Sequence, residues 1–203
     1  MSKTLTDVQI KETAEAHGLE PAALKAVDMV ESKGSGFLPD GRPVILFEGH
    51  IFWKQLIRRG IDPHRFTFGN RDILFPAWTE ETRKFYQGGA AEHLRLKRAA
   101  EINREAALSS ASWGRFQVLG LNWDICGFQS LQKFINAMYR DEAAHLKAAV
   151  EFIKSRRLTA ALRDRDWPAF ARGYNGAGYA ANQYDVKLAR AYEEALEKGY
   201  NHG

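Results

Sequence analysis

Signals for helix boundaries recur along almost the whole chain, whereas only one short run is typical of a β-strand. Thr6 and Gln9 have the spacing of a capping box, and Gly18 follows where a helix would stop. These signals predict a first helix over residues 6–17. Pro21 then begins a second helix, because proline is well tolerated in a first helical turn. These helix start and stop signals restrict the chain to a mainly helical fold.

Further helices are predicted from apolar spacing and capping residues, including Asp166 as an N-cap. They run over residues 50–58, 90–108, 112 onward, 130–157, 167–173 and 184–198. The run RPVILFE, residues 42–48, is apolar, β-branched and bounded by glycines, which predicts a strand. Residues 61–89 are rich in turn signals and read as a long loop with short elements. No repeat or linker divides the chain, so we expect one domain over residues 1–203, mainly α (α+β) with a small β element.

Composition narrows the classes of protein. The chain has 203 residues, of which 45% are hydrophobic, enough to bury a sizeable core. No run of about 18 apolar residues is present, so stable membrane insertion is not expected. One cysteine rules out a disulfide framework, and the net charge of +4 suits an anionic partner. The basic stretches 93–98 and 154–165 are interpreted as solvated helix faces rather than as a nucleic-acid site.

Glu31 is the first candidate for chemistry. It follows Leu24 and Val27 on the apolar side of the second predicted helix, in its last turn. Burial and the negative end of the helix dipole both disfavour a carboxylate there and raise its pKa. A glutamate that stays protonated near neutral pH is suited to general acid catalysis. Gly34 and Gly36 let the chain turn away, although the same pattern also fits a solvated residue at a helix end.

Three short motifs occur in a particular order: Glu-Ser at 31–32, SWGRFQ at 112–117 and YNG at 174–176. This order resembles the lysozyme-like superfamily, especially goose-type lysozymes and lytic transglycosylases. Longer stretches, AVDMVESKGSGF, GRPVILFEGHIFW, SWGRFQVLGLNW and FARGYNGAGYAANQYDVKLARAY, look like the N-acetylmuramidase family of phage and prophage endolysins. The resemblance covers roughly residues 20–195.

The resemblance implies a two-lobed lysozyme-like fold and an endolysin that cleaves the β-1,4 bond between N-acetylmuramic acid and N-acetylglucosamine. It implies peptidoglycan glycan strands as the partner. The residues themselves lead us to expect neither a metal ion nor a cofactor, since the histidines are scattered and no HExxH or Walker A motif occurs. Many members carry a separate peptidoglycan-binding domain, and none is expected here. No secretory signal is visible, so the protein would wait in the host bacterial cytoplasm. A holin-type release partner would then give it access to peptidoglycan in the periplasm. We expect a monomer.

Glycoside hydrolysis commonly uses a second carboxylate, and Glu48 is the leading candidate. It ends the predicted strand, where we expect it to be solvated and ionised, in contrast to Glu31. Asp40, in the preceding turn, is the reserve candidate. The alternative for Glu48 is a charge that pairs with Arg42 or His50. Lytic transglycosylases use one glutamate, so that reaction is favoured if neither Glu48 nor Asp40 lies near Glu31.

The resemblance also implies residues that bind the glycan. Gln117, Tyr174 and Asn175 match cleft positions of the family, and amides and aromatic rings suit sugar hydroxyls, acetamides and C–H faces. Trp113 and Ser112 adjoin them. Trp113 either stacks on a sugar or packs in the core, and Ser112 either touches substrate or caps a helix.

Other classes of function stay open. A non-catalytic wall-binding module on the same scaffold and a basic nucleic-acid binder are the alternatives to an enzyme. Glu142 and His145 have the Glu-x-x-His spacing of some metal sites, but it occurs once and reads as surface. Gly49 departs from the resemblance, which leads us to expect a bulkier basic residue between Glu48 and His50.

Overall fold

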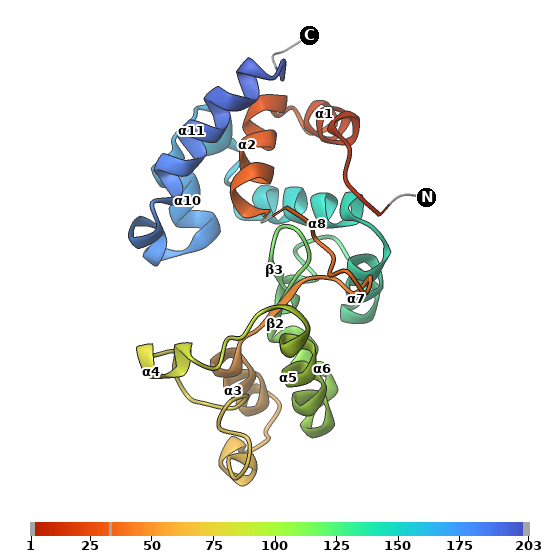
Figure 1. Ribbon diagram of the computed structural model, residues 1–203, viewed down its shortest axis with the longest axis vertical. Coiled ribbons are helices and arrows are strands. Elements are labelled where there is room, and N and C mark those ends of the chain that lie inside the picture. The colour runs from red at the N-terminus through yellow and green to blue at the C-terminus, as the bar shows by residue number, and fades with distance from the viewer. Residues whose placement is uncertain (1–2, 33, 201–203) are drawn as a thin grey trace.

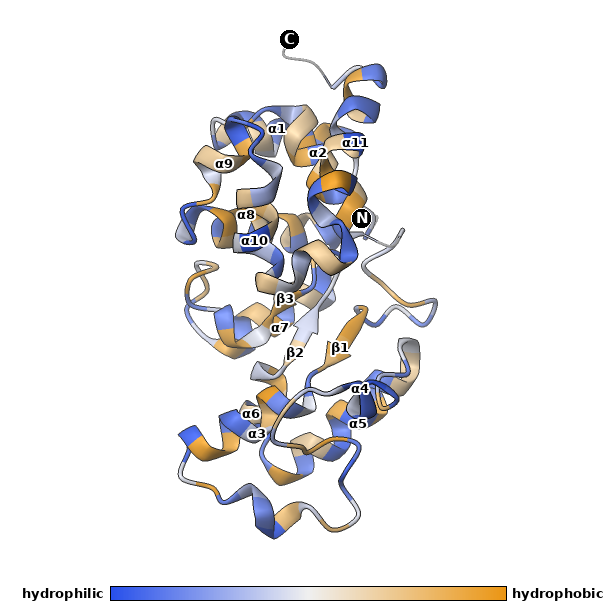
Figure 2. Ribbon diagram, turned by 90° about the vertical axis from the view of Figure 1, so that its left-hand side faces the viewer, coloured by the Kyte–Doolittle hydropathy of each residue, from blue (hydrophilic) through white to orange (hydrophobic). Residues whose placement is uncertain are grey.

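The computed structural model describes residues 3–32 and 34–200. Its helices form two lobes, with a small β-sheet between them (Figure 1; Figure 2 shows the same arrangement from the side). This confirms the predicted mainly α fold with a small β element. No helix that the structure describes is both long enough and apolar enough to cross a bilayer.

The upper lobe in Figure 1 contains the first two and the last four α-helices in chain order. These helices are α1 (Asp7–Ala16), α2 (Pro21–Glu31), α8 (Glu142–Ser155), α9 (Thr159–Arg163), α10 (Trp167–Asn175) and α11 (Tyr184–Glu197), with the 3-10 helix η3 (Ala177–Asn182). The capping box is confirmed: Thr6 Oγ1 accepts from Gln9 N, and Gln9 Oε1 accepts from Thr6 N. Asp166 caps α10 as predicted, since its carboxylate accepts from Ala169 N at 3.0 Å. Local signals therefore define the starts of α1 and α10.

The lower lobe contains α3 (Gly49–Arg58), the 3-10 helix η1 (Pro63–Phe66), α4 (Glu80–Arg83), α5 (Gly89–Ile102) and α6 (Arg104–Ser109). The 3-10 helix η2 (Gly120–Asn122) and α7 (Leu131–Arg140) lie nearer the sheet. The single helix predicted over 90–108 is divided, because Asn103 leaves helical geometry and accepts from Ala106 N at 2.9 Å. The basic stretch 93–98 is not wholly solvated either. His93 and Arg95 are buried, whereas Leu94 is exposed.

The sheet consists of β1 (Ile45–Phe47), β2 (Ala111–Trp113) and β3 (Val118–Leu119), antiparallel and in that order. Leu46 pairs with Ser112, and Ser112 pairs with Leu119. The prediction of a helix from residue 112 is therefore wrong. The first two residues of SWGRFQ end β2 and the other four form a hairpin loop, in which Gly114 and Gln117 have φ angles of +68° and +49° that no α-helix contains.

A buried ionic network joins the hairpin loop to the upper lobe. Arg115 forms a two-pronged ion pair with Asp28, whose carboxylate accepts from Nε and, at 3.0 Å, from Nη2. Its Nη1 donates to Gly34 O at 2.9 Å and to Glu142 Oε2 at 3.3 Å. The interpretation of Glu142 and His145 as surface residues is wrong, since each is 1% exposed. The network fixes the chain on both sides of the end of α2.

His145 is a neutral member of this network. Its Nδ1 accepts from Arg115 N at 3.0 Å, so its Nε2 carries the proton and donates to Met138 O at 2.8 Å. Gly36 and Gly114 provide the space for the ring, because an added Cβ would lie 2.7 and 2.5 Å from Nδ1. Packing therefore requires both glycines, and Gly114 is also required by its positive φ angle.

We expect Arg115→Ala to lower the free energy of unfolding by about 3–5 kcal/mol, because it removes the guanidinium shared by two buried carboxylates and leaves Asp28, among the described residues, with only its 3.5 Å ion pair to Lys25. Denaturant unfolding would measure this change. Arg83→Ala is the matched control, since Arg83 and its partner Glu80 are both highly exposed and such pairs contribute about 0–1 kcal/mol. Equal effects of the two substitutions would contradict the importance of the network.

Candidate active site

Two adjoining hollows form a cleft beside the sheet. One, of about 460 Å³, lies between the hairpin, α8 and the end of α10. The other, of about 250 Å³, is lined by residues of both lobes, including Glu31, Ser35, Gly88 and Gly89. Gln117 lines both hollows, so the hairpin loop forms the part they share. The end of α2 therefore opens into this cleft.

The Glu31 carboxyl is the acidic group of the cleft. It lies at the last residue of α2, and its Oε1 accepts from Asn175 Nδ2 at 2.8 Å. Burial raises the pKa of Glu31, and the hydrogen bond from Asn175 opposes part of that rise. Burial, and then the charge of Glu31, raise the pKa values of Tyr174 and Tyr184, so both phenols lie close to it. Glu31 is half-buried, so the predicted desolvation and raised pKa are confirmed, and the catalytic role of Glu31 stays a prediction.

Asn175 contacts Glu31 directly rather than facing the cleft alone. It ends α10, lines the larger hollow, and gives its amide N–H to the carboxyl. Its Oδ1 is buried and has no hydrogen-bond partner among the described residues. The amide is therefore occupied by Glu31 on one side and shielded on the other. Asn175 is better placed to orient Glu31 than to hold a sugar through free amide atoms.

The other predicted binding residues divide into two groups. Gln117, Tyr174 and Ser112 line the cleft. Gln117 Nε2 donates to Gly114 O at 2.8 Å, and the Tyr174 hydroxyl donates to Phe116 O at 3.2 Å, so both side chains are held in place. The structure thus brings residues of the hairpin and of α10 to one surface.

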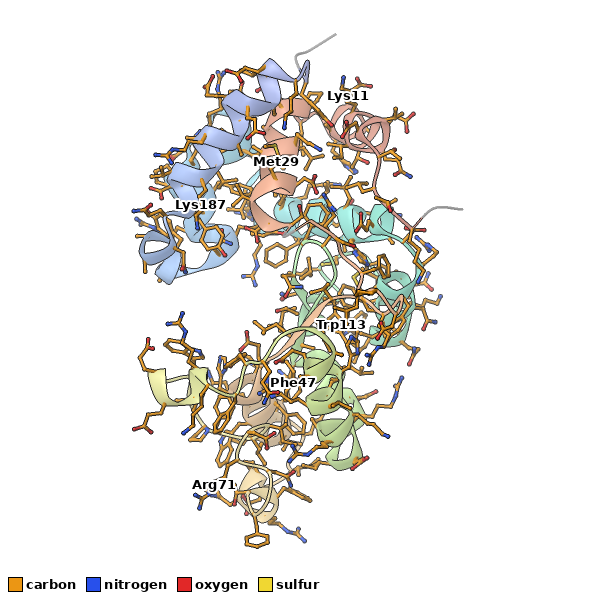
Figure 3. The ribbon with its side chains drawn as sticks, viewed as in Figure 1. Lys11, Met29, Phe47, Arg71, Trp113 and Lys187 are labelled. Atoms are coloured by element: carbon orange, nitrogen blue, oxygen red, sulfur yellow. The ribbon has the colours of Figure 1, made fainter. Side chains whose placement is uncertain are left out.

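The prediction of Trp113 as a sugar-binding residue is corrected. Its side chain is 1% exposed and its indole N–H donates to Leu108 O at 3.2 Å, at the level of the sheet (Figure 3). Successive residues of a strand point to opposite faces, so Ser112 reaches the cleft and Trp113 enters the core. Ser112 is a strand residue, so the alternative of a helix cap is also wrong.

Glu48 lies after β1, at the start of α3, and differs from its prediction. Its side chain is 20% exposed, and burial raises its pKa, against the lowering effects of the Tyr86 hydrogen bond and the Arg95 charge. The Tyr86 hydroxyl donates to Glu48 Oε2 at 2.7 Å. His50 Nδ1 lies 3.5 Å from the same oxygen, and burial lowers the His50 pKa. The expected solvated Glu48 is therefore wrong, because Tyr86 comes from a distant segment to cover it.

Close packing explains why residue 49 is a glycine. A Cβ at this position would overlap the ring of Phe75, and Ile73 O would lie 2.9 Å away. The ring of His50 stacks on Phe75 with 6.3 Å between the centroids. Phe75 therefore occupies the space where the resemblance suggested a bulkier side chain between Glu48 and His50.

Asp40, the reserve carboxylate, is an exposed turn residue. It pairs with Arg42 at 2.6 Å, and this hydrogen-bonded partner lowers the Asp40 pKa. It lines neither hollow of the cleft. The structure does not bring Asp40 to Glu31, and it also shows that Arg42 pairs with Asp40 rather than with Glu48.

Sequence reasoning missed Tyr86 and Tyr184. Neither has a local pattern, because Tyr86 meets Glu48 through a tertiary hydrogen bond and Tyr184 is affected by the charge of Glu31, which is far away in sequence. The available signals were weak: Tyr86 precedes a Gly-Gly pair, and Tyr184 begins a helix. Within residues 3–32 and 34–200, no group of three or more His, Cys, Asp or Glu side chains is arranged to hold a metal ion.

Comparisons with known proteins identify the family. A model of the N-acetylmuramidase family matches residues 20–196. The crystal structure of the Burkholderia AP3 phage endolysin matches with a TM-score of 0.87 and 39% sequence identity, covering 97% of this chain and 73% of that chain. No curated protein sequence gives a significant match. The chain belongs to the N-acetylmuramidase family of peptidoglycan-degrading glycoside hydrolases.

Proposed function

We propose that the protein hydrolyses the β-1,4 bond between N-acetylmuramic acid and N-acetylglucosamine, with Glu31 as general acid and Glu48 as general base. The observation that carries the proposal is the buried carboxyl of Glu31 at the surface of the cleft. Glu31 gives its proton to the glycosidic oxygen while the bond to the sugar carbon breaks. Glu48 takes a proton from the water that attacks the resulting oxocarbenium-like centre.

Asn175 suits a neighbour that changes its protonation state. With its present orientation the amide donates to the Glu31 carboxylate. After rotation by half a turn, the amide oxygen accepts from the protonated carboxyl. One side chain can therefore hold Glu31 both before and after proton transfer, with no charge of its own.

The assignment of acid and base rests on the different neighbours of the two carboxyls. Burial raises both pKa values. Glu48, however, lies in the field of Arg95, whose lowering effect on the pKa outweighs the opposing effect of Glu92. At Glu31 the effect of burial on the pKa is opposed by a neutral partner, the amide of Asn175. A cationic neighbour therefore favours the ionised form at Glu48, whereas the partner of Glu31 is neutral, and on this difference we assign the base to Glu48 and the acid to Glu31.

A lytic transglycosylase is the second candidate, because Glu48 lines neither hollow of the cleft. In that reaction the substrate's own hydroxyl is the nucleophile, and the product carries an anhydromuramic end. Glu48 would then have no water to activate. The chemical nature of the product ends distinguishes the two reactions.

The glycan would bind along the hairpin and the end of α10. Gln117, Tyr174 and Ser112 line this surface and offer amide, ring and hydroxyl groups. We also propose that the protein acts as a monomer and is released from the host bacterial cytoplasm to the periplasm by a holin-type partner. The similarity to a phage endolysin supports this route. Lysis of cells by this protein without any membrane-disrupting protein would argue against it.

Glu31→Gln should lower the rate at which soluble fragments are released from purified sacculi by about 100-fold or more, because the acid is lost. Mass spectrometry of the wild-type digest should give reducing muramic ends. Glu15→Gln, at an exposed position on α1, is the control and should keep the wild-type rate. Full activity of Glu31→Gln would refute the acid assignment, and sacculus binding without cleavage by either protein would indicate a binding module.

The pH profile of kcat/KM on soluble glycan strands should be bell-shaped. Activity rises with pH as Glu48 loses its proton and falls as Glu31 loses its own. Both limbs should lie above the usual range for glutamate, since burial raises both pKa values. Glu48→Gln should remove the acidic limb and lower the rate by about 100-fold or more. Anhydromuramic products together with an unaffected Glu48→Gln rate would establish the transglycosylase instead.

A further inference from the structure

Tyr86 joins the segment that follows α4 to the proposed base. The Tyr86 hydroxyl donates to Glu48 Oε2 at 2.7 Å across 38 positions of sequence. In the part of the chain that the structure describes, it supplies the one hydrogen bond that this carboxylate accepts. We propose that Tyr86 is a positioning residue that fixes the Glu48 carboxylate in the orientation needed to activate water. This inference rests on the proposed role of Glu48.

A single buried ion pair holds both ends of the Tyr86–Glu48 contact. Glu92 Oε2 accepts from Phe47 N, the residue before Glu48, at 2.9 Å. Glu92 Oε1 accepts from Gln87 N, the residue after Tyr86, also at 2.9 Å. Glu92 and its partner Arg95 are 0% and 4% exposed, and their side chains meet at 2.7 Å. The backbone next to Glu48 and the backbone next to Tyr86 are therefore both anchored to the Glu92 carboxylate.

The ring of Tyr86 is held independently of its hydroxyl. The Arg95 guanidinium lies 5.1 Å from the ring centroid, and Phe75 contacts the ring edge-on at 6.5 Å. Removing the hydroxyl leaves these contacts in place. A Phe substitution therefore tests the hydrogen bond with little disturbance of the packing.

The charged and titratable groups around Glu48 explain why a neutral hydrogen-bond donor, the Tyr86 hydroxyl, suits a general base. Arg95 lowers the Glu48 pKa and Glu92 raises it, while burial and Lys54 lower the pKa of the neighbouring His50, which leaves that ring neutral. Burial, and then Glu48 itself, raise the pKa of Tyr86. The phenol therefore keeps its proton throughout the working pH range. It stabilises the carboxylate without neutralising it, so Glu48 remains able to take a proton.

The test is Tyr86→Phe, with Tyr192→Phe as the matched control. Tyr192 donates to Glu20 at 2.8 Å in the upper lobe, which is the same kind of bond remote from Glu48. For Tyr86→Phe we expect kcat on soluble glycan strands to fall by about tenfold or more with KM nearly unchanged. Loss of the donor disfavours the carboxylate, so the acidic limb of the pH profile should move to higher pH. Tyr192→Phe should change neither quantity.

A direct measurement of the Glu48 pKa tests this inference separately from the proposed function. Titration of ¹³C-labelled glutamate carboxyls by NMR, with the Glu48 signal identified by its absence in Glu48→Gln, gives the Glu48 pKa without any activity measurement. We expect Tyr86→Phe to raise that pKa while the melting temperature stays close to that of the wild type. An unchanged pKa and an unchanged kcat would overturn the inference. Full activity of Glu48→Gln would instead overturn the base role, and Tyr86→Phe would then shift the pKa without changing kcat.

Discussion

The ion pairs of Arg115 are the constraint on which the cleft depends. The guanidinium lies between Asp28 and Glu142, so its ion pairs join three separate parts of the chain, and removing it would leave the buried Glu142 carboxylate without this cation. Asp28 lies one turn before Glu31, and Arg115 lies two positions before Gln117. The same network therefore sets the end of the acid-bearing helix against the hairpin loop that lines both hollows.

The two carboxyls of the proposed mechanism are both desolvated, and they differ in the groups that contact them. Glu31 accepts a hydrogen bond from an amide. Glu48 accepts one from a phenol, and the charge of the buried Arg95 also lowers its pKa. A positive charge close to Glu31 would lower its pKa and favour loss of the proton that an acid must carry. The positive charge of Arg95 lowers the Glu48 pKa and so opposes part of the rise that burial causes. The chemistry of each partner is therefore matched to the protonation state that each carboxyl needs.

The sequence predicted the elements that local signals define. The capping box at Thr6, the proline that opens α2 and the burial of Glu31 are all encoded within a few neighbouring residues. The hairpin at 112–119 was missed because its backbone is set by pairing with β1 and by the approach of His145, which lie far away in sequence. The covered state of Glu48 was missed for the same reason, since the covering phenol belongs to a loop without periodicity. Motif order predicted which residues gather at the cleft, but not which face of the strand each one occupies.

Each carboxyl is paired within its own lobe. Asn175 and Glu31 both belong to the upper lobe, whereas Tyr86 and Glu48 both belong to the lower part, below the sheet (Figure 1). A hinge movement that opened the cleft would thus separate the acid from the base while leaving both hydrogen bonds intact. The distance between the two groups could adapt to a thick polymer during entry and exit. The hydrogen-bond partner of each carboxyl would stay the same throughout, so closure would not have to form either of these two bonds.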